Sequence, residues 1–209
     1  MKAKCSKCGR EYEVRAYPLI NVASDPELKA RVRDGSIFVG DCPYCGARNL
    51  LKYESLYHDP AEHLMIWLLP DGAPAEEKLQ AISDALRGEL GNYTLRRVHE
   101  AGELMEKINI FNAGLDDAVM EMCKYITRME LSTTQKDASL RDVPMKFSGA
   151  DSPDHELIFS YFHNGGAFTV NVGFNVYEDC RAILSRNSAL LPGTPFPCID
   201  AEWVTSVIR

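Results

Sequence analysis

Cys5-Ser6-Lys7-Cys8-Gly9 and Cys42-Pro43-Tyr44-Cys45-Gly46 are the two stretches that decide the fold of the N-terminal part of this chain. In each stretch, two residues separate a pair of cysteines, and this spacing lets both sulfurs converge on one tetrahedral ion. The glycine after each second cysteine permits a positive φ, so that backbone N–H groups can point at the sulfurs. We therefore predict one Zn²⁺ bound by Cys5, Cys8, Cys42 and Cys45.

The predicted site is structural, because four protein ligands leave no open position on the ion for water. A module of about 60 residues has a small hydrophobic core and is marginally stable by itself. A structural zinc can add on the order of 10 kcal/mol of binding free energy, which becomes folding free energy. Two alternatives stay open. One is a thioredoxin-like redox pair, normally single and opening a helix, and the other is four unrelated buried thiols.

The chain between and after the cysteine pairs carries short β and α patterns. Asp25 can cap a helix over 25–33, Pro26 suits its first position, and Asp34-Gly35 can end it. Further strands are predicted at 12–17, 37–39 and 49–57. The continuous apolar run from His63 to Leu69 has strand length and predicts a fully buried strand. Pro70-Asp71-Gly72 then breaks the chain, so we place a domain boundary between residues 70 and 71.

The remainder, residues 71–209, mixes helical and β periodicity. Helices are predicted at 74–88, 100–112, 116–131 and 177–185, strands at 93–99, 143–147, 156–162 and 167–176, and a short helix or strand at 201–208. His163-Asn164-Gly165-Gly166 is a hairpin signal between the last two strands. The fold class is therefore α+β, with an N-terminal rubredoxin-like zinc ribbon that contains an inserted helix, followed by a mixed helical and antiparallel β body.

Beyond the cysteines, several motifs resemble those of the CpXC-domain family. They are Ile20-Asn21-Val22, Asp25-Pro26-Glu27-Leu28-Lys29, Asp34-Gly35, Leu56-Tyr57-His58-Asp59, Met65-Ile66-Trp67-Leu68-Leu69-Pro70 and Asn112-Ala113-Gly114-Leu115-Asp116-Asp117. The resemblance runs to about residue 130, and the first cysteine stretch departs from it with Ser6 where proline is common. It implies a zinc-binding bacterial domain with no established biochemical activity.

The charge of the chain is uneven along its length. Residues 1–60 hold ten Lys/Arg against eight Asp/Glu, a net charge of +2, whereas residues 61–209 hold thirteen against twenty-two, a net charge of −9. The acidic body would repel a phosphate backbone, which disfavours nucleic-acid binding. No signal-peptide pattern follows Met1, and the run at 64–69 is too short to span a bilayer. We expect a cytoplasmic protein whose cysteines are thiols or metal ligands, without a membrane partner.

Other candidate residues have simpler structural readings. His58 and His63 could be ligands, but four cysteines already complete a site, and Asp59 could bond His58 or set a turn. Asp116 and Asp117 fit a helix start better than paired catalytic carboxylates. Cys123 is expected in the core with Val119, Met122 and Ile126, and Trp67 is expected to be buried. Cys180 and Cys198 lie in no nucleophile motif, so no catalytic residue is predicted, although a Cys–His pair stays open.

Three functions remain. The first is a non-catalytic protein-binding or adaptor module, motivated by the closed metal site. The second is an enzyme with a site in the 71–209 body, which is larger than a ribbon needs. The third is nucleic-acid binding through the basic side chains of the N-terminal module, namely Arg10, Arg15, Lys29, Arg31, Arg33 and Arg48.

Overall fold

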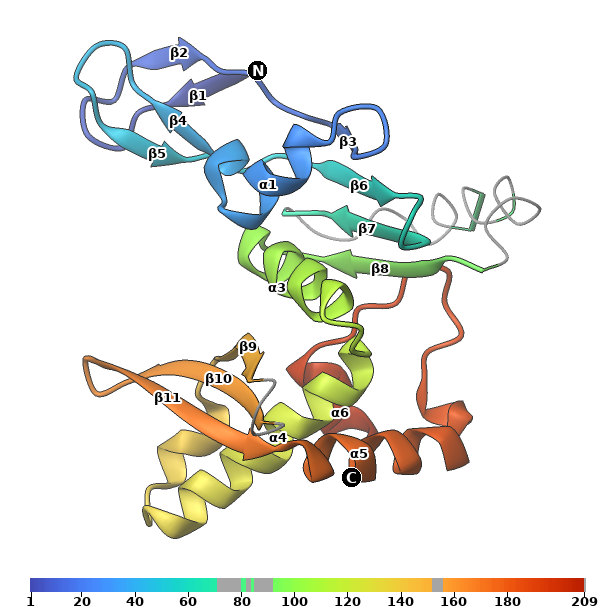
Figure 1. Cartoon of the computed structure of the whole chain (residues 1–209). Helices are drawn as coiled ribbons and strands as arrows, with labels where there is room; N and C mark the ends of the chain where they lie inside the picture. The colour runs from blue at the N-terminus through green and yellow to red at the C-terminus, as the bar shows by residue number, and fades with distance from the viewer. Residues whose placement is uncertain (71–79, 82–83, 85–91, 152–155, 209) are drawn as a thin grey trace. The chain divides into compact units, whose positions relative to one another are not determined.

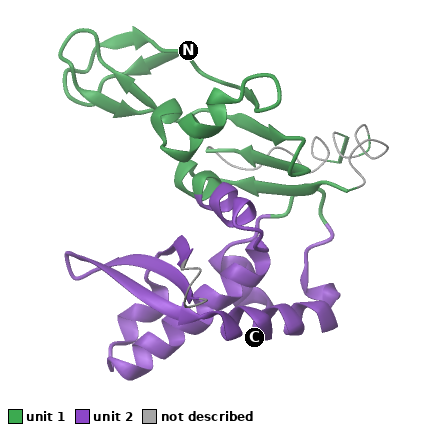
Figure 2. Ribbon diagram, viewed as in Figure 1, with its two compact units in different colours: residues 1–105, 194–197 green, residues 106–193, 198–209 purple. Residues whose placement is uncertain are grey.

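The computed structural model describes residues 1–70, 80, 81, 84, 92–151 and 156–208. It is an α+β protein, as predicted, with helices, antiparallel and mixed sheets and a cysteine cluster near the N-terminus (Figure 1). The chain divides into two compact units (Figure 2): unit 1 is residues 1–105 with 194–197, and unit 2 is residues 106–193 with 198–209. The predicted boundary between residues 70 and 71 stays a prediction, because 71–79 lie outside the described residues.

Unit 1 begins with two small antiparallel hairpins. The first pairs β1 (Lys2–Lys4) with β2 (Glu11–Glu13), and the second pairs β4 (Val39–Asp41) with β5 (Arg48–Leu50). Each hairpin closes around one cysteine pair. The predicted strand at 37–39 is wrong over its first two residues, which belong to the 3₁₀ turn η1 (Ser36–Phe38) and are buried there.

The rest of unit 1 is a four-stranded mixed sheet in the order β3-β6-β7-β8. Its strands are β3 (Leu19–Asn21), β6 (Ser55–Asp59), β7 (Leu64–Leu68) and β8 (Thr94–Val98), and only the β6–β7 pair is antiparallel. Every residue of β7 is buried, which confirms the predicted buried strand. It lies between two strands, and Trp67 packs edge-on against Phe196 with ring centroids 5.6 Å apart.

The helix α1 (Glu27–Arg33) follows β3 in the chain and buries Leu28 and Val32. The predicted cap at Asp25 is wrong, because Pro26 occupies the N-cap position and no side chain caps the helix. The predicted end is confirmed: Asp34 is the C-cap, and Gly35 follows with φ +75°. The predicted helix at 74–88 falls almost entirely outside the described residues.

Unit 2 is built from helices against one three-stranded antiparallel sheet in the order β11-β10-β9. The boundary between the units lies within α3 (Ala101–Asn112). The elements that follow α3 are α4 (Asp117–Thr134), η2 (Ala138–Asp142), β9 (Met145–Asp151), β10 (Glu156–His163), β11 (Gly166–Gly173), α5 (Phe174–Arg186), η3 (Ser188–Leu190) and α6 (Ala201–Val207). The predicted hairpin is confirmed, with positive φ at Asn164 and Gly165 (+48° and +77°). None of the helices among the described residues is both long and apolar enough to cross a membrane.

The core of unit 2 lies between α4, α5, α6 and the sheet, and it includes Cys123 and Trp203. Val119, Met122 and Cys123 are buried as predicted, but Ile126 is 37% exposed, so the predicted apolar stripe of α4 is wrong at its last position. The same helix also buries the charged residues Glu121 and Lys124, which form an ion pair with each other.

Candidate metal centre

Two cysteine turns, residues 5–9 and 42–46, have the same backbone conformation. The N–H of Gly9 donates to the carbonyl of Cys5 (3.0 Å), and the N–H of Gly46 donates to the carbonyl of Cys42 (2.9 Å). Gly9 and Gly46 have φ of +71° and +67°, where an L side chain is disfavoured. The glycine that follows each cysteine pair is therefore required by backbone conformation, as the sequence predicted.

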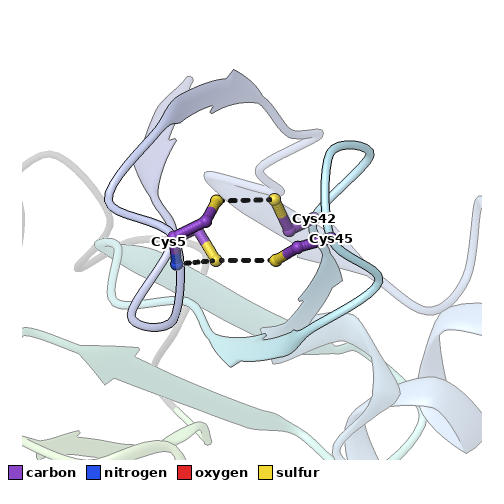
Figure 3. A group of neighbouring side chains, drawn as sticks. Cys5, Cys42 and Cys45 are labelled. Carbon is purple, nitrogen blue, oxygen red and sulfur yellow. Dashed lines mark hydrogen bonds between the residues drawn. The ribbon is translucent and has the colours of Figure 1, made fainter.

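The four sulfurs form one group (Figure 3). The Sγ atoms of Cys5, Cys8, Cys42 and Cys45 all lie within 4.8 Å of one another. The closest pairs across the two turns are Cys5–Cys45 at 3.6 Å and Cys8–Cys42 at 3.7 Å. A tetrahedral Zn²⁺ with Zn–S bonds of about 2.3 Å holds its sulfurs about 3.8 Å apart, whereas a disulfide is about 2.05 Å long. The separations therefore fit four free thiols around one ion.

The same geometry weighs against the two alternatives. Four unrelated thiols would not converge from turns 33 residues apart in the sequence. A thioredoxin-like pair would open a helix, but the first cysteine turn leads into β2 and the second into β5. The two hairpins thus supply one cysteine pair each to a shared site, compatible with metal binding.

Asn49 is the residue near the sulfurs that sequence reasoning missed. It is 6% exposed on β5, and its Nδ2 donates to the Cys5 Sγ (3.8 Å) and to the carbonyl of Ala47 (2.8 Å). Its Oδ1 accepts from the backbone N–H and the hydroxyl of Ser6 at 2.8 and 2.9 Å. One amide therefore ties the first cysteine turn to the second hairpin. The signal available in the sequence was an asparagine within the predicted strand 49–57, because asparagine is depleted in strands.

The electrostatics of the group favour a bound cation. The N–H of Cys8 donates to the Cys5 Sγ at 3.5 Å and lowers the pKa of the Cys5 thiol to about 6 although burial opposes this. The N–H of Ala47 would lower the pKa of Cys45 too, but burial and the neighbouring sulfurs raise it to about 11. One thiolate thus makes the next harder to form. A divalent cation among the sulfurs would remove that repulsion.

The CpXC protein family profile matches residues 3–124, which is more than half of the chain. The chain belongs to the CpXC family. One relative among curated proteins, from Treponema pallidum (strain Nichols), carries the description "Uncharacterized protein" and is 24% identical over 140 residues. That match covers 60% of this chain and 61% of the relative's length. No solved structure matches the chain.

The histidines next to the cysteine hairpins do not join the sulfur group. His58 Nε2 lies 3.1 Å from the Tyr93 hydroxyl, and the His63 ring packs edge-on against the same tyrosine at 5.5 Å. Asp59 is 2% exposed and bonds Lys29 Nζ at 2.7 Å rather than His58. Burial alone would raise the pKa of Asp59, but the Lys29 ammonium holds it below its usual value.

The candidate carboxylates and thiols of unit 2 have structural roles. Asp116 caps α4 by accepting from two backbone N–H groups, as predicted, whereas Asp117 is fully buried and binds Lys107 Nζ at 2.6 Å. The thiol of Cys180 and burial raise the pKa of its neighbour Cys123, so this thiol is a weak nucleophile. Cys198 donates to an oxygen of Asp200 at 3.1 Å.

Proposed function

We propose that this CpXC chain binds one structural Zn²⁺ through Cys5, Cys8, Cys42 and Cys45, and that the resulting rubredoxin-like ribbon is a non-catalytic protein-binding module. The convergence of four sulfurs at zinc-like separations is the observation that supports the metal. A four-thiolate ion has no free position for water or substrate, so its role would be to hold the two hairpins together.

Exposed apolar side chains on the second hairpin support the binding role. Tyr44, in the cysteine turn, is 55% exposed, and Leu50, on β5, is 68% exposed. The Arg10 guanidinium lies over the Tyr44 ring at 5.1 Å, which orients the ring at the surface. Tyrosine and arginine on a rigid support are typical anchors of protein–protein interfaces.

The basic residues of unit 1 give less support to nucleic-acid binding. Arg15 and Arg31 both lie over the ring of Tyr17, at 4.7 and 5.2 Å, and Lys29 is neutralised by Asp59. Side chains held in this way are poorly placed to neutralise a phosphate backbone.

Affinity purification from the native source, with metal analysis of the product, tests both parts of the proposal. The chain should carry one zinc and retain a stoichiometric protein partner. The double variant Tyr44→Ser/Leu50→Ser should keep the zinc and lose the partner, whereas Ile183→Ser, at a residue of unit 2 that is 43% exposed, should keep both. A folded chain that carries no zinc would overturn the proposed metal site. A partner that still binds the double variant would overturn the proposed binding surface at Tyr44 and Leu50.

A further inference from the structure

Unit 2 contains a cavity of about 620 Å³ between α4, η2 and α6. The α4 wall carries Tyr125, Arg128 and Met129, which share one face of that helix because they are three and four residues apart. The cavity lies entirely within unit 2 and shares no residue with the cysteine hairpins. What it binds is therefore independent of the function proposed above.

Arg128 is the residue of this cavity that internal packing does not explain. Its side chain is 6% exposed, and its buried Nε has no hydrogen-bond partner among the described residues. Burial lowers the pKa of Arg128, and although Glu121 and Asp142 oppose this electrostatically, neither forms a salt bridge with it within the described part of the chain. A buried guanidinium nitrogen without a hydrogen-bond partner destabilises a fold, so its presence requires a reason.

The neighbouring lysine on the same helix shows how this fold treats a buried cation that serves structure. Lys124 lies one turn before Arg128 and binds Glu106 at 3.0 Å and Glu121 at 2.5 Å. Lys124 is therefore saturated by carboxylates of unit 2. Arg128, which is 6% exposed, borders the cavity and forms no salt bridge with a carboxylate of the described residues. The difference indicates that the partner of Arg128 comes from outside the chain.

The other polar walls of the cavity restrict what that partner can be. Arg141 adds a second guanidinium, positioned by a bond from its Nε to the Ser132 hydroxyl (3.2 Å), while Asp142 and Glu202 add two carboxylates. Two cations against two anions do not favour a multiply charged phosphate. They favour a ligand that carries one positive and one negative group.

The hydroxyls of α6 point to the same kind of ligand. Thr205 donates its proton to the carbonyl of Ala201 (2.8 Å), and Ser206 donates its proton to the carbonyl of Trp203 (2.6 Å). Both residues line the cavity, and because their hydroxyl protons are used within the helix, their oxygens can accept hydrogen bonds from a ligand but not donate them. Together with Glu202, they form a wall suited to an ammonium group.

We propose that this cavity binds a small zwitterion of the α-amino-acid class. The carboxylate of the ligand pairs with the Arg128 fork, whose planar geometry matches a carboxylate in two hydrogen bonds. The ammonium group faces Glu202 and the hydroxyls of α6. The apolar part of the ligand contacts Met129 and the ring of Tyr125.

The first test titrates the full chain with free L-amino acids, one at a time, and follows backbone amide shifts by NMR. At least one amino acid should cause saturable shifts in α4, η2 and α6, and acetate or methylammonium alone should bind more weakly. Arg128→Lys keeps the charge but loses the fork, so it should weaken binding roughly tenfold or more. Arg186→Lys, at an exposed position of α5, should bind as the wild type does. No saturable shift with any amino acid, or inorganic phosphate binding as tightly as the best one, would overturn the proposal.

A second test needs no ligand. Arg128→Met replaces the buried guanidinium by an apolar side chain of similar length, and the melting temperature of the ligand-free chain should stay the same or rise, because an unpaired buried charge is removed. A clear fall in the melting temperature would mean that Arg128 braces the fold, and it would overturn the assignment of a binding role.

Discussion

The cysteine hairpins of unit 1 and the helical core of unit 2 are stabilised in different ways. The hairpins consist of three-residue strands, and the apolar cluster around them is formed by Cys5, Tyr12 and Cys42 with a few half-buried neighbours. Unit 2 instead buries apolar side chains from α4, α5, α6 and the sheet in one continuous core. A metal ion can therefore supply in the first region what packing supplies in the second.

Cys42→Ser should have the largest effect, because it removes one of the four proposed ligands from the region that would depend on them. A structural zinc contributes on the order of 10 kcal/mol, far more than the hairpins can replace. The expected result is loss of bound zinc and of amide protection in β1, β2, β4 and β5, with protection in α4 and β10 retained. Metal analysis and hydrogen exchange by mass spectrometry measure both.

Cys198→Ser is the matched control, since Cys198 is a half-buried thiol of unit 2 outside the sulfur group. It should keep the metal and the protection of all strands. Hairpins that stay protected in Cys42→Ser would contradict the idea that the ion holds them together.

Lys124→Met should have the next largest effect, and in the other region. It leaves the carboxylates of Glu106 and Glu121 buried without the ammonium that they share. Breaking a buried pair in this way costs about 3–5 kcal/mol, measured by denaturant unfolding. Adding Glu106→Gln and Glu121→Gln should recover most of the loss, because no buried charge of this group is then left unpaired and Lys146, the other partner of Glu106, is 43% exposed to water. A triple variant as unstable as the single one would show that Lys124 acts through packing.

Asn49→Ala tests whether the sulfur group needs its hydrogen-bonding neighbour as well as its ligands. The amide joins Cys5, Ser6 and Ala47, and loss of such a contact to a metal ligand lowers metal affinity by about 10- to 100-fold. Competition with a chromophoric chelator measures the change. Asn171→Ala, which removes an exposed hydrogen bond to Glu156 on the sheet of unit 2, should leave zinc affinity unaltered.

The stability of unit 2 should depend on pH through Glu106. Burial alone would raise the pKa of this carboxyl, but the ammonium groups of Lys124 and Lys146 and the N–H of Phe147 hold it below its usual value. Stabilisation by Glu106 is therefore complete above the pKa of an unfolded glutamate and is lost as pH falls through the lower folded pKa.

The difference in unfolding free energy between wild type and Glu106→Gln isolates this effect, which is about 1.4 kcal/mol for each unit of pKa shift. The difference should be largest near neutral pH and should shrink as pH falls below about 4. The subtraction is needed because Glu121 titrates as well: burial outweighs the ammonium groups of Lys124 and Lys107 and raises the pKa of Glu121, which gives the opposite pH dependence. A difference that grows on acidification would contradict the prediction.

Local patterns predicted much of this fold. Cysteine spacing predicted that the four sulfurs meet, His163-Asn164-Gly165-Gly166 predicted a hairpin, and the apolar run at 63–69 predicted a buried strand. The hairpin and strand signals lie within the segments that they specify, whereas the two cysteine pairs predict a contact across 33 residues because each pair supplies half of one tetrahedral site. The φ preference of the turn residues and the apolar pattern of the strand act within these short segments themselves.

Some of the misses came from contacts between distant segments. The predicted strand at 49–57 is two strands, β5 and β6, because the chain leaves one sheet and joins another between them. Leu51 and Tyr53 are nevertheless buried in the interval, so the period of two continues and hides the break. The link from Glu106 to Phe147, 41 residues away, likewise has no local signature.

Arg48→Met should have the smallest effect, and it shows what burial contributes to the comparison. Arg48 and Asp41 form an ion pair of 3.6 Å across the second hairpin, with side chains 78% and 69% exposed. The charges are of the same kind as in the Lys124 pairs, but water screens them, so the loss should be below about 0.5 kcal/mol. Denaturant unfolding of the zinc-loaded chain measures it. If Arg48→Met cost as much as Lys124→Met, charge pairing itself would stabilise both regions, and the contrast between hairpins held by the proposed ion and a unit held by core packing and buried ion pairs would fail.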